Sequence, residues 1–202
     1  MADDLLSVAR KVIEALDRLG IAHVIGGSFA SAAHSVPRTT NDVDLVAEVE
    51  PQHIGPLAEA LQGEFYIDTE AVSDAVRRGA SFNVIHYDSA HKVDIFVRGS
   101  DPFRAAQIAR RRLETVGDTV WPVLSPEDTI LAKLQWYRDG GEVSERQWRD
   151  VIDVITVQGQ RLQMDYLRPA SEEMGLGELL RRALATAARP WAGSPGGRGW
   201  SA

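Results

Sequence analysis

The chain has 202 residues, of which 44% are hydrophobic, so it can bury the core of one domain, or of one domain with a small appendage, and its composition disfavours wholesale disorder. Its formal net charge of −7 disfavours general binding to nucleic acids or anionic membranes, because both present phosphate charges. It contains no cysteine, which excludes disulfides, thiolate zinc sites and a cysteine nucleophile.

The N-terminal stretch MADDLLSVARKV is acidic and then amphipathic, so it lacks the basic lead and apolar core of a signal peptide. Apolar residues recur at helical spacing through residues 5–19, and Gly20 follows them, which predicts a first helix and its end. No apolar run approaches the roughly 18 residues that span a membrane. We therefore expect a cytoplasmic protein that makes no contact with a membrane.

Short strands and helices alternate through the rest of the first half. The strand AHVIGG leads into a helix of small residues at 28–34, which Pro37 ends. The strand DVDLVAEV follows, and two later strands, SFNVIHY and HKVDIFV, form a hairpin across residues 88–91. The remaining elements expected in this half are helices at residues 51–61 and 69–78 and a strand at residues 65–68.

The stretch before residue 125 mixes helical and strand signals. Residues 101–113 read as a helix, and its RRR run at residues 110–112 either lies on a solvated helix face or receives an RNA acceptor. TVWPVL reads as an edge strand, because Pro122 cannot donate to a sheet ladder.

The second half of the chain is helical. Ser125 is expected to cap one long helix, with Asp128 completing a capping box, and Ser144 to cap a second. Two shorter helices are expected at residues 165–173 and 178–188. The sequence thus predicts an α/β domain over residues 1–124, a C-terminal helical subdomain over residues 125–189 and a disordered tail over residues 190–202.

Two carboxylates stand two residues apart in an otherwise apolar strand. Asp42 and Asp44 point to the same face of that strand, where two bare carboxylates repel each other. Asp94 stands in a second strand, between Val93 and Ile95. A divalent cation such as Mg²⁺ removes the repulsion, and three acids on neighbouring strands suit a two-metal site. The alternative is that Asp42 and Asp44 face water at a strand end.

A glycine pair precedes the first acids and opens a short helix. Gly26 and Gly27 let the backbone approach a phosphate closely, and the helix N-terminus offers free N–H groups to it. Ser28 adds a hydroxyl donor. Neither the GxGxxG nor the GxxxxGK[ST] pattern occurs, so a dinucleotide fold and a P-loop are not indicated.

The span GGSFASAAH, the D-x-D strand and the later KVDIF together resemble the DNA polymerase β-like nucleotidyltransferase superfamily. Lys133, and Arg149, Asp150 and Asp153 in RQWRDVIDV, resemble the later motifs of abortive-infection-type nucleotidyltransferases. Those are stand-alone bacterial enzymes, some of them toxins of toxin–antitoxin pairs. The resemblance covers residues 21–155 and implies a mixed, mostly antiparallel sheet with flanking helices, followed by the helical subdomain.

The resemblance also implies a reaction, in which a nucleoside triphosphate (NTP) gives its monophosphate to an acceptor and releases pyrophosphate. The triphosphate ligands implied are Gly26, Gly27, Ser28, Lys133 and Arg38. The residues implied to bind Mg²⁺, or Mn²⁺ in its place, are Asp42, Asp44 and Asp94. Asp94 is also implied to help deprotonate the acceptor hydroxyl. An antitoxin is the partner that a toxin role implies.

The helical motifs have structural alternatives. Lys133 reads equally as an exposed lysine on a helix whose apolar face lies elsewhere. Asp150 and Asp153 share a helix face, and each has an arginine four residues before it, Arg146 and Arg149, so surface ion pairs also explain them.

The aromatic residues, the histidines and the overall charge do not decide between an enzyme and a binding module. Trp136, Tyr137 and Trp148 are expected to pack the two long helices together, with base stacking as the alternative. The five histidines show no zinc-ligand spacing.

A catalytically inactive module that binds a nucleotide or a partner is the rival to an enzyme. The acceptor stays open among a small molecule, transfer RNA and a protein hydroxyl, and the acidic charge favours a neutral or cationic one.

Overall fold

The computed structural model describes residues 4–36, 40 and 42–188. Its strands form one seven-stranded sheet in the order β3-β4-β5-β2-β1-β7-β6. The strands are β1 (His23–Ile25), β2 (Val43–Ala47), β3 (Phe65–Tyr66), β4 (Ser81–His86), β5 (Lys92–Val97), β6 (Arg112–Val116) and β7 (Thr119–Val123). Two neighbouring pairs, β1–β7 and β2–β5, are parallel and the other four are antiparallel, which confirms the mixed, mostly antiparallel sheet.

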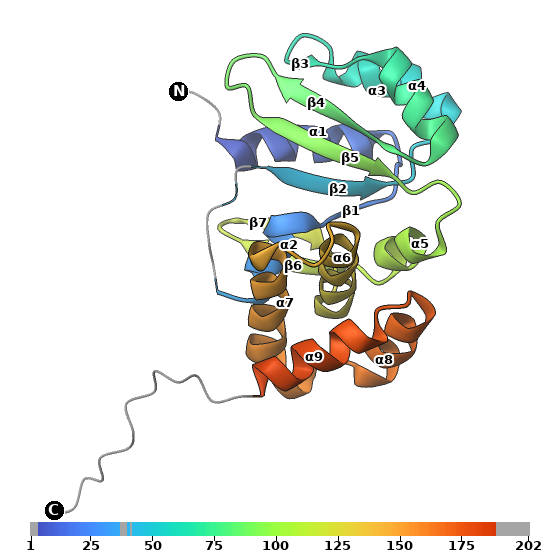
Figure 1. Ribbon diagram of the computed structural model, residues 1–202. Coiled ribbons are helices and arrows are strands. Elements are labelled where there is room, and N and C mark those ends of the chain that lie inside the picture. Colours follow the sequence, from blue (N-terminus) through green and yellow to red (C-terminus); the bar gives the residue numbers. More distant parts are fainter. Residues whose placement is uncertain (1–3, 37–39, 41, 189–202) are drawn as a thin grey trace, which may run out of the picture.

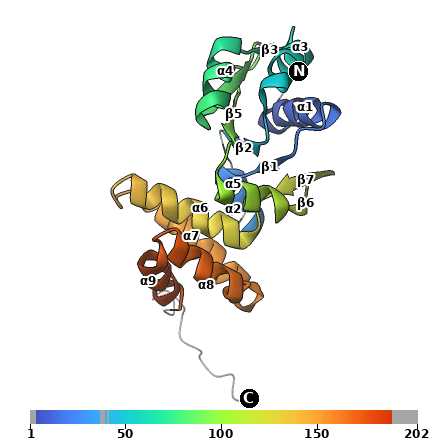
Figure 2. The ribbon, with the colours of Figure 1, turned by 90° about the vertical axis from the view of Figure 1, so that its right-hand side faces the viewer.

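The helices of the first half flank the sheet, and those of the second half pack around a second hydrophobic core. Those of the first half are α1 (Leu5–Arg18), α2 (Gly27–His34), η1 (Pro51–His53), α3 (Ile54–Leu61), α4 (Thr69–Arg78) and α5 (Pro102–Ala109). Those of the second half are α6 (Pro126–Asp139), α7 (Glu145–Gln158), η2 (Gly159–Arg161), α8 (Met164–Glu173) and α9 (Gly177–Ala187). Figures 1 and 2 show α3 and α4, with β3, at one end of the molecule and α8 and α9 at the other, with β1, β2, β6 and β7 between them.

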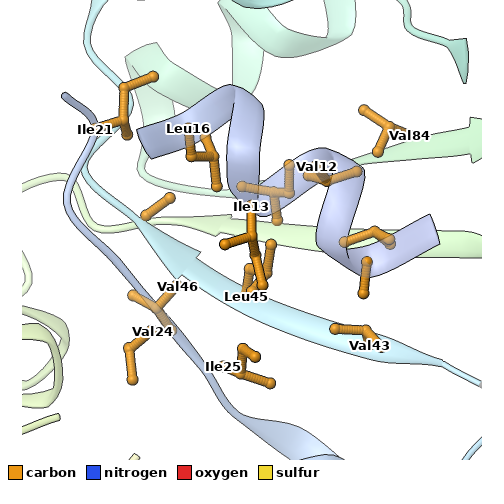
Figure 3. Packing of buried hydrophobic residues seen from close by; sticks show 14 of the residues in the cluster. Val12, Ile13, Leu16, Ile21, Val24, Ile25, Val43, Leu45, Val46 and Val84 are labelled. Carbon is orange, nitrogen blue, oxygen red and sulfur yellow. The ribbon is translucent and has the colours of Figure 1, made fainter. Parts of the chain in front are cut away.

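The buried apolar side chains fall into two clusters. The first lies between α1 and the sheet, where Figure 3 shows Ile13 of α1 beside Leu45 of β2. The second contains apolar residues of α6, α7, α8 and α9 and begins at Ile130. Ser125 caps α6 between the two clusters, as predicted. Among the described residues, none of the helices combines the length and apolarity that crossing a membrane requires.

Two expectations for the stretch before α6 are wrong. The helix predicted over residues 101–113 ends at Ala109, and its last residues belong to β6, so Arg112 lies on a strand rather than a helix face. TVWPVL forms β7, but β7 is not an edge strand, because β6 pairs with its outer side. Pro122 is tolerated there because β1 pairs with β7 only at Val123.

Candidate active site

A cleft of about 620 Å³ lies between the sheet and the helical half. Its lining brings together residues from β2, β5, α2, α5, α6 and α7. Of the residues that the sequence singles out, Gly26, Gly27, Ser28, Asp42, Asp44, Asp94 and Lys133 line it. Asp150 and Asp153 do not line the cleft. Arg38 falls outside the described residues, as does the tail over residues 190–202.

The glycine pair allows the start of α2 to pack closely against Asp44 of β2. Gly27 has a φ of +56°, and a Cβ at this position would lie 1.7 Å from a carboxylate oxygen of Asp44. The Gly26 N–H donates to the Asp44 carbonyl oxygen at 2.8 Å. No side chain caps the first turn of α2, because its N-cap residue is Gly26. Any larger residue at position 27 would separate the helix N-terminus from the carboxylate.

Asp44 and Asp94 are direct neighbours across two parallel strands. They are paired in the β2–β5 register. On β5 the side chains of Val93, Ile95 and Val97 are buried, so Asp94 lies on the opposite, cleft-facing side. The predicted convergence of acids from two strands is therefore present in the geometry.

The electrostatics of Asp44 reflect this crowding. Burial raises the pKa of Asp44, and the charges of Asp42 and Asp94 raise it further, to about 6. The charges of the Lys133 and Lys92 ammonium groups oppose this rise to a smaller extent. The protein thus holds a half-buried carboxylate beside two others without fully compensating its charge, and a bound cation would relieve that repulsion.

The outer two acids are engaged by polar neighbours. Lys92 Nζ lies 2.7 Å from Asp94 Oδ2, and the Thr40 hydroxyl lies 3.0 Å from Asp42 Oδ1. Within the described part of the chain, no three His, Asp or Glu side chains are gathered closely enough to hold a metal ion as they lie. The donor set suits a hard divalent cation, because carboxylate oxygens are its preferred ligands.

Lys133 is not the exposed lysine of the structural alternative. Its side chain is 7% exposed, it lines the cleft, and its Nζ lies 2.8 Å from Asp150 Oδ2. Asp150 is also buried, so it does not lie on the exposed helix face on which the structural alternative placed it. The pair joins α6 to α7 and fixes the lysine beside the acids.

Arg146 instead reaches the glycine-rich turn. Its Nη2 donates to Ser28 Oγ at 2.8 Å, and both residues line the cleft. This contact links the start of α7 to the start of α2, 118 positions apart in the sequence. Spacing along the chain gives no signal for such a contact, and from the sequence Arg146 enters only as the possible partner of Asp150 in a surface ion pair.

Trp136 also lies elsewhere than expected. Tyr137 and Trp148 do pack together between α6 and α7, with ring centroids 5.1 Å apart. Trp136 instead lines the cleft with 57% of its surface exposed. Its ring stands edge-on to Phe96, with centroids 6.1 Å apart.

Comparison with known proteins identifies the fold. No protein-family model and no curated protein matches the sequence. The solution structure of the antibiotic-resistance factor ANT(2'')-Ia is similar with a TM-score of 0.54 and 13% identity, and the match covers 90% of this chain and 98% of that chain. A crystal structure of ANT(2'')-Ia with adenylyl-2''-tobramycin has a TM-score of 0.54 and 17% identity, covering 84% of this chain and 97% of that chain. An antigenic nucleotidyltransferase-like protein from Paracoccidioides brasiliensis has a TM-score of 0.53 and 22% identity, covering 88% of this chain and 91% of that chain. At these identities the likeness establishes that the chain has the nucleotidyltransferase fold.

Proposed function

We propose that this protein is a divalent-metal-dependent nucleotidyltransferase. The observation that carries the proposal is the pairing of Asp44 with Asp94 in a cleft that also contains the uncapped start of α2. An acceptor oxygen attacks the α-phosphorus of an NTP, the bond from that phosphorus to the β-bridging oxygen breaks, and pyrophosphate leaves. The acceptor proton passes to a base, so the products are a nucleotidylated acceptor, pyrophosphate and a proton.

The triphosphate is assigned to the α2 side of the cleft. The free N–H groups at the start of α2 and the Ser28 hydroxyl are donors for phosphate oxygens, and Gly27 lets the backbone approach them. Arg146 and Lys133 add positive charge from α7 and α6, and Asp150 holds Lys133 in place. We also propose Arg38, close before Asp42 in the sequence, as a phosphate ligand.

The three cleft acids have two assigned roles. Asp42, Asp44 and Asp94 would hold Mg²⁺, or Mn²⁺ in its place, which neutralises phosphate charge and lowers the pKa of an acceptor hydroxyl when bound. Asp94 accepts the proton of the acceptor hydroxyl. We assign no role to Asp153, because it does not line the cleft.

Pyrophosphate release tests the proposal. Each of the four NTPs, labelled at the α-phosphate, is incubated with Mg²⁺, protein and a cell lysate, and we expect pyrophosphate release and transfer of label to an acceptor. The Asp42→Ala/Asp44→Ala double variant should fold and lose both signals, whereas Asp118→Ala, an exposed acid outside the cleft, should keep them. Transfer at the wild-type rate by the double variant would rule the proposal out.

The rival, an inactive binding module, gives a different result in the same experiment. Such a module would be stabilised against heat by a nucleotide and would release no pyrophosphate. The crowded carboxylates favour the enzyme, because binding alone does not require three acids in one cleft.

We propose in addition that the protein acts as a toxin, because the motifs that contain Lys133 and Asp150 resemble those of the abortive-infection-type nucleotidyltransferases. Induced expression in a bacterial host should then arrest growth, and Asp94→Asn should abolish the arrest. Normal growth during expression of active wild-type protein would remove the toxin role and leave the chemistry intact.

A further inference from the structure

An aromatic ledge, formed by Phe96 and Trp136, stands beside the cleft acids. Phe96 is two residues after Asp94 on β5, so both side chains face the cleft about 6.6 Å apart along the strand. The ring of Trp136, on α6, packs edge-on against the ring of Phe96, and 57% of the surface of Trp136 is exposed. Arg104 holds Phe96 from another side, with its Cζ 5.9 Å from the ring centroid. The ledge is therefore an ordered apolar surface open to the cleft.

The order of the strands places the ledge away from the phosphate-binding end. Across the sheet, β2 lies between β1, which leads into α2, and β5. Asp44 on β2 thus separates the start of α2 from Asp94 and Phe96 on β5. In an in-line displacement the attacking oxygen and the leaving pyrophosphate lie on opposite sides of the phosphorus. With pyrophosphate at α2, the attacking hydroxyl enters from the β5 side.

The charges at the ledge disfavour an anionic occupant. Among the described residues at this end, Arg104 pairs with Asp101 and donates to the Gly79 and Val97 carbonyls. Lys92 pairs with Asp94, and Arg138 pairs with Asp139. Each of these cations is already engaged, and the carboxylates of Asp94, Asp101 and Asp139 line the cleft itself. A phosphate group would gain no uncommitted positive partner here.

We propose that the aromatic ledge is the acceptor subsite, and that the acceptor is a small hydroxylated ring compound, neutral or cationic and without phosphate. This inference rests on the proposed nucleotidyl transfer. The apolar face of the ring lies on Trp136 and Phe96 by dispersion, and a cationic group on the ring is favoured by the indole face and the nearby carboxylates. One ring hydroxyl then lies at Asp94, gives it the proton and bonds to the α-phosphorus as pyrophosphate leaves.

A fractionated lysate tests the subsite. The lysate is separated into RNA, protein and a filtrate below 3 kDa, and the filtrate is passed over an anion exchanger. Each fraction is incubated with Mg²⁺, α-labelled NTP and protein. We expect label to enter the compounds that flow through the exchanger. The Trp136→Ala variant should lower this labelling at least tenfold through a higher acceptor KM, and Trp136→Phe should restore most of it.

A matched control and the contrary outcomes separate the two proposals. Tyr66→Ala removes an aromatic side chain that is 51% exposed on β3 and outside the cleft, and it should label as wild type does. Label in RNA, in protein or in exchanger-bound compounds would overturn the acceptor class, as would pyrophosphate release with no labelled product. Full labelling by Trp136→Ala would overturn the subsite. Absence of pyrophosphate release from wild type in every fraction would instead refute the nucleotidyl transfer itself.

Discussion

Carboxylates lie close together in two regions of this molecule, buried in one and half-buried in the other, and their surroundings differ. In the junction, defined by Glu127, Asp128, Arg110 and Tyr166, both carboxylates are fully buried. Asp128 accepts hydrogen bonds from the Tyr166 hydroxyl at 2.6 Å and the Ser125 hydroxyl at 2.8 Å. Arg110 stacks on the Tyr166 ring, and its Nε lies 3.4 Å from Asp128 Oδ2. In the cleft, the largest influences on Asp44 after burial are two further carboxylates.

The two pKa shifts express the difference. Burial raises the pKa of Asp128 and of Asp44. For Asp128, the hydrogen bonds from Tyr166 and Ser125 and the charge of Arg110 counteract that rise. For Asp44, the charges of Asp42 and Asp94 add to it. In the junction, Asp128 is hydrogen-bonded by Tyr166 and Ser125 and lies beside Arg110, whereas in the cleft Asp44 lies beside two further carboxylates, whose charge a bound cation would offset.

Removing one cleft acid should have the largest effect, and on activity rather than on stability. We expect Asp94→Asn to lower nucleotide transfer on the order of 10³-fold, because it removes a cation ligand and the proton acceptor. Its free energy of unfolding should change by less than about 1 kcal/mol, since only a half-exposed ion pair with Lys92 is lost. Steady-state transfer and urea denaturation measure the two quantities, with Asp118→Asn as the exposed control.

Removing one junction acid should do the reverse. Asp128→Ala leaves Arg110 and the Tyr166 hydroxyl without their carboxylate, and we expect a loss of about 4 kcal/mol in the free energy of unfolding. Urea denaturation measures this loss, and Asp165→Ala, an exposed acid on α8, should stay within about 1 kcal/mol of wild type. A near-neutral Asp128→Ala would show that the junction acids do not stabilise the fold.

Neutralising the most crowded cleft acid should stabilise the metal-free protein. The folded-state pKa of Asp44 is raised from 3.8 to about 6, so its ionisation at pH 7.5 costs about 3 kcal/mol of folding free energy. Asp44→Asn avoids that cost. The cost is relieved as the pH falls from about 6 to about 4, so the advantage of the variant should shrink over this range. Thermal unfolding of both proteins in EDTA measures it, and equal stability at pH 7.5 would contradict the crowding.

The smallest of these effects concerns a single hydrogen bond in the junction. Tyr166→Phe keeps the ring under Arg110 and removes only the hydroxyl that donates to Asp128. We expect a loss of about 1.5 kcal/mol in the free energy of unfolding with unchanged transfer per folded molecule. A decrease in transfer that exceeds the loss of folded protein would mean that the junction acts on catalysis.

The comparison also shows which parts of the site the sequence can predict. Side-chain alternation along a strand is a local property, so the shared face of Asp42 and Asp44 followed from the pattern, whereas the meeting of Asp44 with Asp94 depends on the pairing of β2 with β5 and was expected from the family resemblance. Ser125 as the cap of α6 also followed from the local pattern. The Asp128 side chain, however, turns to Tyr166, which lies 38 positions away, where a capping box was expected.

Contacts between elements that are distant in the sequence were beyond prediction for the same reason. The Arg146–Ser28 and Lys133–Asp150 contacts depend on how α7 sits against α2 and α6, which no spacing reports. Trp136 faces the cleft because Tyr137, its neighbour on α6, takes the position against Trp148. The strand β6 was mistaken for the end of a helix, because its pairing with β7 outweighs local helical preference.

Manganese binding tests most directly whether the cleft acids are cation ligands. Free Mn²⁺ is followed by its electron paramagnetic resonance signal while protein is added without nucleotide, because a triphosphate would itself bind the ion. Wild type and Tyr166→Phe should both deplete the free-ion signal, and Asp44→Asn and Asp94→Asn should leave most of the ion free. Equal depletion by wild type and both cleft variants would show that Asp44 and Asp94 do not bind the metal.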